Sequence, residues 1–146
     1  MGNIHFFTED TAYQVTQKAT VKAWLKEVIK TEGYKTGEIS IILCGDRYLL
    51  NINKQYLQHD TYTDIITFDN SEQADVIAGD IFISIDRVQE NAAKFGVPEQ
   101  DELHRVIIHG ILHLCGYGDK KKEEKVMMTD KENFYLALRD RQQNNL

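Results

Sequence analysis

Cysteine, proline and long apolar runs are all scarce in this sequence of 146 residues. Its two cysteines, Cys44 and Cys115, are too few for a disulfide framework and are typical of a reduced, cytoplasmic protein. One proline and nine glycines exclude a collagen-like or low-complexity chain. No apolar run approaches the ~20 residues that a membrane-spanning helix needs, and the N-terminus lacks the basic and apolar segments of a signal peptide. We therefore expect a cytoplasmic protein with no membrane partner.

Positive charge is in deficit as well, with 17 Lys and Arg against 23 Asp and Glu and a formal net charge of −6. This balance argues against a protein that coats nucleic acid without specificity. The acidic excess lies in residues 1–100, because basic and acidic residues are equal in number in residues 101–146. The densest basic run, KKK at 120–122, lies in the neutral part, where charge patterning alone favours a solvated helix face.

Residues 1–146 are expected to form one domain, because the chain has the length of one domain and shows neither an internal repeat nor a linker. Runs of β-branched and apolar residues predict strands at residues 3–7, 38–44, 65–68 and 77–85. Amphipathic spacing and capping residues predict five helices. The first is capped at Asp10 or Thr11 and ends at Gly33, the second is capped at Asp46, and the third is capped at Ser84 or Asp86 and ends near Gly96. The fourth starts at Pro98 and ends at Gly116, and the fifth covers residues 121–141, where the capping-box pair Thr129 and Glu132 could divide it. This order predicts an α+β fold, a small mixed sheet of about four strands with helices packed on it.

The most informative segment contains two histidines four residues apart, His109 and His113, followed by Gly116 and Asp119. Residues i and i+4 differ by only about 40° around an α-helix, so both imidazoles project from one face and can share a metal ion. Gly116 can adopt the left-handed backbone that ends a helix, and the turn after it can return the Asp119 carboxylate to the same ion. Two nitrogens and one carboxylate oxygen form a plausible Zn²⁺ site with a fourth position open, as in catalytic zinc sites.

Other candidate ligands have simpler interpretations. Cys115 lies about 200° around the helix from the second histidine and cannot reach the same ion. His104 lies about 140° from His109 and is interpreted as an ordinary helix histidine. Asp64 and Asp80 lie beside predicted strands, where a carboxylate either orients a site or serves turn and capping chemistry.

The residue after the first histidine distinguishes between kinds of chemistry. In the zinc protease pattern HExxH this residue is the glutamate that acts as general base. Here it is Gly110, which can neither accept nor donate a proton. A zinc ion could still polarise a phosphoryl or carbonyl oxygen and acidify a water molecule. The sequence therefore predicts zinc hydrolase chemistry with the general base unassigned.

Three segments together resemble the YbeY endoribonucleases, a family of ribosomal RNA maturation factors. HGILHLCGYGD at 109–119 is similar to the family signature HGxLHLxGYDH, AGDIFIS at 78–84 to its LGDIxIS strand, and the segment 53–68 to NxxYRxxDxPTDVLSF. The resemblance implies an α+β fold with one zinc ion per chain, bound at the end of a central helix with His109 and His113 as ligands. It also implies cleavage of single-stranded RNA in small-subunit rRNA maturation and ribosome quality control, with the small subunit and its assembly factors as partners.

The sequence departs from the family pattern at three positions. Asp119 stands where the family usually has a third histidine, and a carboxylate is also a normal zinc ligand. Leu57 replaces an arginine thought to hold phosphate or stabilise charge in the transition state, which leucine cannot do. Tyr62 replaces a proline.

Basic residues elsewhere are the candidates for the role of that arginine. The nearest along the chain are His59 and Lys120, and we expect Lys120 to join His109 and His113 as a catalytic residue. Two other functions stay open. One is a metzincin-like zinc protease, which the missing glutamate disfavours, and the other is a non-catalytic ribosome-assembly factor with a structural metal site, which Leu57 favours.

Overall fold

A computed structural model describes residues 2–58 and 63–144 of the chain. The elements follow one another in the order β1 (Ile4–Glu9), α1 (Lys18–Thr31), β2 (Lys35–Cys44), α2 (Asp46–Leu57), β3 (Ile65–Asp69), β4 (Val76–Ser84), α3 (Ile85–Phe95), α4 (Glu99–Leu114) and α5 (Lys122–Asn144). This order confirms the predicted α+β fold. None of the helices described is long and apolar enough to cross a membrane.

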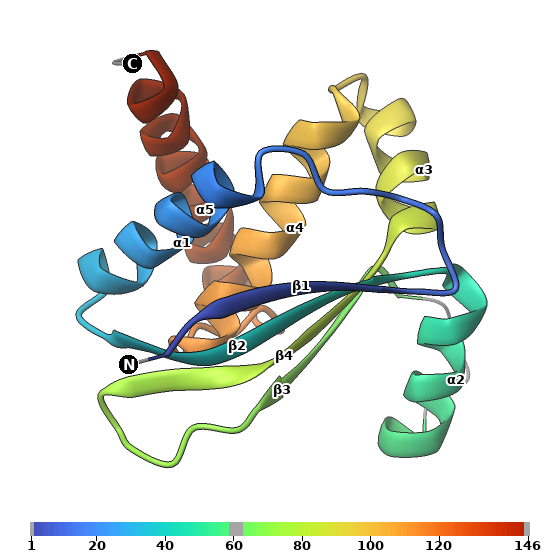
Figure 1. Ribbon diagram of the computed structural model, residues 1–146, viewed down its shortest axis with the longest axis horizontal. Helices are drawn as coiled ribbons and strands as arrows, with labels where there is room; N and C mark the ends of the chain where they lie inside the picture. The colour runs from blue at the N-terminus through green and yellow to red at the C-terminus, as the bar shows by residue number, and fades with distance from the viewer. Residues whose placement is uncertain (1, 59–62, 145–146) are drawn as a thin grey trace.

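The strands form one mixed sheet in the order β1-β2-β4-β3. β1, β2 and β4 run parallel, whereas β3 pairs with β4 in the antiparallel sense and places Thr67 opposite Ile81. Figure 1 shows α1, α4 and α5 on one face of the sheet and α2 on the other. α4 contacts both β3 and β4, so the edge strand β3 lies beside the helix that carries the paired histidines.

The main core lies between the sheet and the helices of the first face. Alternation along a strand sends every second side chain to the same face, and Ile39, Ile41 and Leu43 of β2 are fully buried there. They share this core with Val28 of α1 and Ile107 of α4. A smaller core packs α2 against the opposite face. α4 contacts α1, α3, α5 and the sheet, and it is therefore the central helix.

The first helix begins later than predicted. α1 starts at Lys18, not at a cap formed by Asp10 or Thr11. Asp10 has a positive φ of 56° just after β1, and the Thr11 hydroxyl accepts a hydrogen bond from the Tyr13 N–H at 3.3 Å. Such local hydrogen bonds compete with helix formation. The buried face of the helix begins only at Val21. Asp10 and Thr11 are therefore too far from the first buried residue to start the helix.

The remaining helix boundaries lie closer to the predictions. Ser84 caps α3 by accepting a backbone N–H at 3.2 Å. Asp46 is the first residue of α2 rather than its cap, and Pro98 is the cap of α4 rather than its first residue. α5 is continuous, so the break expected at Thr129 and Glu132 was wrong. The Glu132 carboxylate forms its hydrogen bonds with α4 instead of with the backbone of its own helix.

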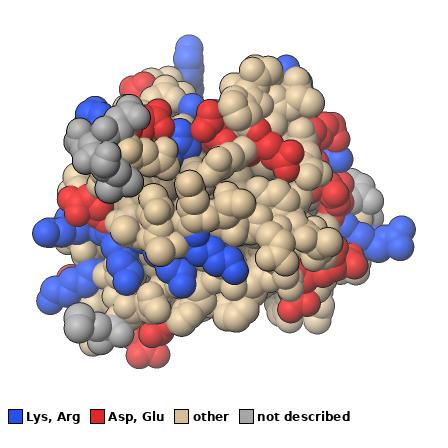
Figure 2. Space-filling view, turned by 45° about the horizontal axis from the view of Figure 1, so that its top comes forward, with Lys and Arg blue, Asp and Glu red and all other residues tan. Residues whose placement is uncertain are grey.

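Charged side chains are unevenly distributed over the surface. On the face drawn in Figure 2, many Lys and Arg side chains gather on the side of α1, and Asp and Glu gather mainly away from them. Along α1, lysines recur at every fourth residue, at positions 18, 22, 26 and 30. The net charge of −6 is therefore an average over surfaces of different sign.

His104 is buried in the main core, with 2% of its surface exposed. Arg139 donates a hydrogen bond to its Nδ1 atom at 2.8 Å, and its ring centroid lies 5.4 Å from that of Trp24. Burial, together with the Arg139 guanidinium, lowers the pKa of His104 to about 4. This side chain is therefore a neutral link between α1, α4 and α5, in agreement with its interpretation as an ordinary helix histidine.

Acid is expected to weaken the fold through His104. Between the unfolded pKa of about 6.5 and the folded pKa of about 4, the unfolded chain binds a proton that the folded protein does not. His104 therefore costs no stability above about pH 7, and roughly 3 kcal/mol is lost as the pH falls toward 4. In urea unfolding at a series of pH values, His104→Gln should lose less stability than the unchanged protein, because glutamine accepts a hydrogen bond but does not titrate. Equal losses of unfolding free energy in the two proteins would show that His104 is not the group through which acid weakens the fold.

Candidate metal centre

The candidate metal ligands lie where α4 ends. α4 places His109 and His113 on one face, and Gly116, with a φ of 103°, turns the chain so that Asp119 returns toward them. The two histidine Nε2 atoms lie 2.9 Å apart, and the Asp119 Oδ2 atom lies 3.1 Å from the first and 3.3 Å from the second. Cys115 is buried and stays outside this group, as expected. The three residues predicted as ligands form a group that could hold a metal ion.

Both imidazole rings are oriented through their Nδ1 atoms. The Nδ1 of His109 donates to the Glu132 carboxylate at 2.7 Å, and the Nδ1 of His113 donates to the Tyr117 carbonyl oxygen at 2.9 Å. This arrangement directs both Nε2 atoms toward Asp119, and it is the usual environment of metal-binding histidines. Burial lowers the pKa of His109, but the Glu132 and Asp119 carboxylates outweigh this effect and raise it overall. The same carboxylates favour a bound cation.

The donor atoms fit a zinc ion. Corners of a tetrahedral zinc site lie about 3.3 Å apart, because Zn–N and Zn–O bonds are about 2.0–2.2 Å long. The observed separations run from 2.9 to 3.3 Å. Two nitrogens and one carboxylate oxygen, with a fourth position free, form the donor set of catalytic rather than structural zinc sites.

A cavity of about 900 Å³ opens beside the three donor atoms. It lies between the end of α2, β3, α4, the turn after α4 and part of α5. Among the charged groups of its described lining, carboxylates are the most numerous: Asp64, Asp69, Glu102, Asp119 and Glu132. Burial raises the pKa of Asp64 and of Glu102. The positively charged side chains in the described lining are Arg105 and Lys120.

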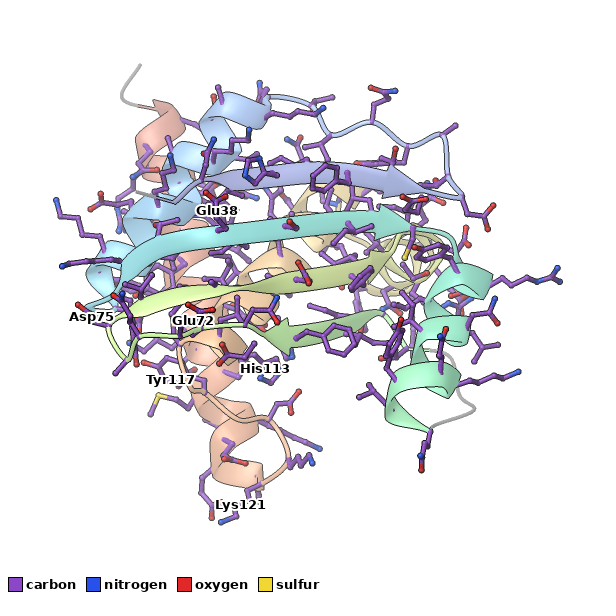
Figure 3. All side chains as sticks on the ribbon, turned by 60° about the horizontal axis from the view of Figure 1, so that its bottom comes forward. Glu38, Glu72, Asp75, His113, Tyr117 and Lys121 are labelled. Atoms are coloured by element: carbon purple, nitrogen blue, oxygen red, sulfur yellow. The ribbon has the colours of Figure 1, made fainter. Side chains whose placement is uncertain are left out.

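The lysine run at 120–122 divides between the cavity and the solvent. Lys120 lines the cavity, as does Leu57 at the end of α2. Figure 3 shows Lys121 far from His113, where the chain enters α5. Of the run, Lys120 is therefore the residue placed near the candidate ligands.

The remaining residues singled out from the sequence have different locations. His59 and Tyr62 lie outside the described residues. Asp64 lines the cavity. Asp80 accepts a hydrogen bond from the Asn70 amide at 3.2 Å and is not among the residues that line the cavity. Of these two aspartates, Asp64 is therefore the one that lies at the candidate site.

The residue that sequence reasoning missed is Glu132 on α5. Its Oε2 atom bonds to His109, its Oε1 atom accepts a hydrogen bond from Arg105 at 3.0 Å, and its side chain is only 8% exposed. The sequence contained one signal, because Glu132 lies in the buried stripe of α5 between Met128 and Tyr135. A carboxylate at a core position needs a partner, and that partner is the cluster on α4.

Glu132→Gln is expected to weaken metal binding. The amide has the same shape but loses the negative charge that holds the His109 ring, and loss of such a partner typically lowers metal affinity about 10–100-fold. Glu123→Gln, an exposed charge loss on the same helix, is the matched control and should leave affinity unchanged. A zinc titration against a competing chelator measures both variants. Equal affinity for the two would show that Glu132 serves only the packing of α5.

Gly110 has a structural reason to lack a side chain. A Cβ atom there would lie 2.8 Å from Ile81 Cγ2 and 3.0 Å from Ile65 Cδ1. The position therefore faces the sheet, at the contact of α4 with β3 and β4. A glutamate in the manner of HExxH has no room here.

These features define a class of protein, an α+β fold with a potential metal site at the end of its central helix, beside a cavity rich in charged groups. Within that class, the chain belongs to the family described as endoribonuclease YbeY, which matches residues 3–139. The resemblance seen in the motifs is thereby confirmed.

Named relatives cover nearly the whole chain. The endoribonuclease YbeY of Cytophaga hutchinsonii is 54% identical over 136 residues, which span 93% of this chain and 95% of that protein. The endoribonuclease YbeY of Parabacteroides distasonis is 50% identical over 135 residues, spanning 92% and 94%. The solution structure of TM1509 from Thermotoga maritima is similar with a TM-score of 0.68 and 27% identity, covering 97% of this chain and 92% of that one. The fold is thus shared along its length.

Proposed function

We propose that this protein is a zinc-dependent endoribonuclease that hydrolyses single-stranded RNA, with one zinc ion per chain. Small-subunit rRNA is its substrate in maturation and ribosome quality control, the small subunit and assembly factors are its partners, and residues 1–146 act as one hydrolase domain. The observation that carries the proposal is the convergence of His109, His113 and Asp119 beside a large cavity, in a chain whose relatives are named endoribonucleases.

The ligand residues would hold the ion through two Nε2 atoms and one carboxylate. A bound divalent cation supplies positive charge that polarises a phosphoryl oxygen and acidifies a water molecule. Glu132 and the Tyr117 carbonyl oxygen keep the two rings in place, so that little reorientation is needed on binding.

Asp64 is the carboxylate we assign as general base, the role that Gly110 cannot fill. It lines the cavity, and burial raises its pKa by more than the nearby His109 lowers it. A raised pKa brings a carboxylate closer to the operating pH, where a general base is most effective. Lys120, exposed at the same cavity, attracts the RNA backbone.

A non-catalytic assembly factor is the second candidate. Leu57 favours it, because an aliphatic side chain lines the cavity in which phosphate would bind. Structural zinc sites, however, are normally closed by four protein ligands. In the described residues three donors converge beside an open cavity, which favours catalysis. The packing of Gly110 against the sheet disfavours the protease.

Digests of a labelled single-stranded RNA and of casein, each with and without a chelator, separate the three functions. We expect cleavage of the RNA, loss of cleavage with chelator, recovery on adding zinc, and intact casein. Cleavage of casein would instead identify a protease. Protein that holds stoichiometric zinc and cleaves neither substrate would be the assembly factor.

Single lysine variants should differ in their effect on RNA binding. Removing one side chain that binds a phosphate lowers the salt slope of single-strand binding by about 0.7. Lys120→Ala should show this decrease, because Lys120 lines the cavity, whereas Lys121→Ala should not. Fluorescence anisotropy of a labelled strand at a series of salt concentrations measures both slopes. A slope that stays at the value of the unchanged protein in both variants would mean that the whole run is a solvated face.

A further inference from the structure

Arg105 belongs to the helix face that carries the candidate metal ligands. Arg105, His109 and His113 are spaced four residues apart on α4, so they follow one another along a single side of the helix. Glu132 bridges the first two, with Oε1 on the Arg105 guanidinium at 3.0 Å and Oε2 on the His109 ring at 2.7 Å. The guanidinium is therefore tied to the metal centre through one buried carboxylate.

The guanidinium is fixed in position but not buried. Glu132 holds one of its NH groups, and Asn133 accepts from another at 2.7 Å. The side chain is still 34% exposed and lines the cavity. Arginine has five N–H donors in a planar fork. Among the described residues, Glu132 and Asn133 are the side chains that accept from it, so donors remain for a ligand.

To bind a polyanion such as RNA, the cavity needs a positively charged side chain that is held in one orientation. Five carboxylates line its described part, more than Arg105, Lys120 and a divalent ion together would neutralise. Lys120 is exposed in the turn before α5 and offers a mobile point charge, whereas Arg105 is held in one orientation. A planar guanidinium binds phosphate oxygens bidentately, which an ammonium group cannot do.

We propose that Arg105 is a phosphate-binding residue of this site and holds a backbone phosphate of the RNA strand in the cavity beside the metal centre. The proposal rests on the proposed function, because it takes RNA as the ligand. It assigns two roles to Glu132, which positions the imidazole of a metal ligand and the guanidinium that meets the substrate. It also supplies, from α4, the positive charge that Leu57 does not provide from α2.

The test measures binding rather than cleavage, with a single-stranded 2′-O-methyl oligonucleotide that resists hydrolysis. Arg105→Gln in the protein as purified should weaken binding roughly tenfold or more and lower the salt slope by about 0.7. Arg47→Gln removes the same charge from an exposed position on α2, which does not line the cavity, and should change neither quantity. Arg105→Lys keeps the charge and loses the fork, so it should keep the slope and bind several-fold more weakly.

Three results would overturn the assignment: no binding of the probe by the unchanged protein, the same affinity in Arg105→Gln and Arg47→Gln, or full affinity in Arg105→Lys. If Arg105→Gln does not fold, Arg105→Lys decides, with zinc content and melting temperature as its controls. A different result would contradict the proposed nuclease function but not the role of Arg105: the unchanged protein binds the probe through Arg105 and yet cleaves no RNA.

Discussion

Asp119→Ala should yield folded protein that is largely free of zinc and inactive on RNA. Asp119 supplies one of three converging donors, 3.1 Å from His109 Nε2 and 3.3 Å from His113 Nε2. Loss of a ligand should reduce affinity by more than the roughly 10–100-fold that follows removal of an outer hydrogen-bond partner. Asp119→His should retain zinc, because imidazole suits the same tetrahedral site.

The alternative role of Asp119 is a cap for the helix that follows. A lost cap would cost about 1 kcal/mol and leave the metal in place. The structure favours the ligand role, because the Lys121 N–H at this helix start donates to Glu124 instead, at 2.9 Å. Zinc content by elemental analysis and melting temperature separate the two roles. Stoichiometric zinc in Asp119→Ala with a small drop in melting temperature would leave a two-histidine site with an unknown third donor.

Gly110→Glu should unfold the protein or leave it barely stable, and should not create a protease. The new Cβ atom would lie 2.8 Å from Ile81 Cγ2, and Ile81 is fully buried. The rest of the side chain would push a carboxylate into an apolar contact, at a cost of several kcal/mol. This is comparable with the total stability of a typical domain, about 5–15 kcal/mol.

A graded series makes this second prediction testable even if the glutamate variant is insoluble. Gly110→Ala should lose about 1 kcal/mol, because overpacking of about 1–3 kcal/mol is partly offset by the better helix propensity of alanine. Gln100→Glu, an exposed position on the same helix, is the control for adding a glutamate and should have little effect. Urea unfolding measures all three variants. A Gly110→Glu protein as stable as the control would show that position 110 does not face the sheet.

The local parts of the site could be predicted from the sequence. His109, His113 and Asp119 lie in one short segment, where helical periodicity and a glycine turn determine how the side chains meet. The order of strands and helices followed from apolar periodicity in the same way. Such inferences need only neighbouring residues, because the 3.6-residue helical repeat acts over a few turns.

The remaining parts depend on packing between distant segments. Glu132 meets His109 across 23 positions of sequence, and this contact exists only because α5 packs on α4. The same packing brings the Arg105 guanidinium to Glu132. The capping-box pattern had instead predicted that Glu132 bonds to the backbone of its own helix. The late start of α1 has a similar cause, because burial from Val21 onward, rather than a capping residue, determines where the helix forms.

Metal analysis of protein purified without added ions, combined with anomalous diffraction at the zinc edge, shows whether His109, His113 and Asp119 bind a zinc ion together. We expect about one zinc ion per chain, with both histidine Nε2 atoms and the Asp119 carboxylate at about 2.0–2.2 Å from the ion. Protein that binds no transition metal, or an ion bound away from His109, His113 and Asp119, would contradict it.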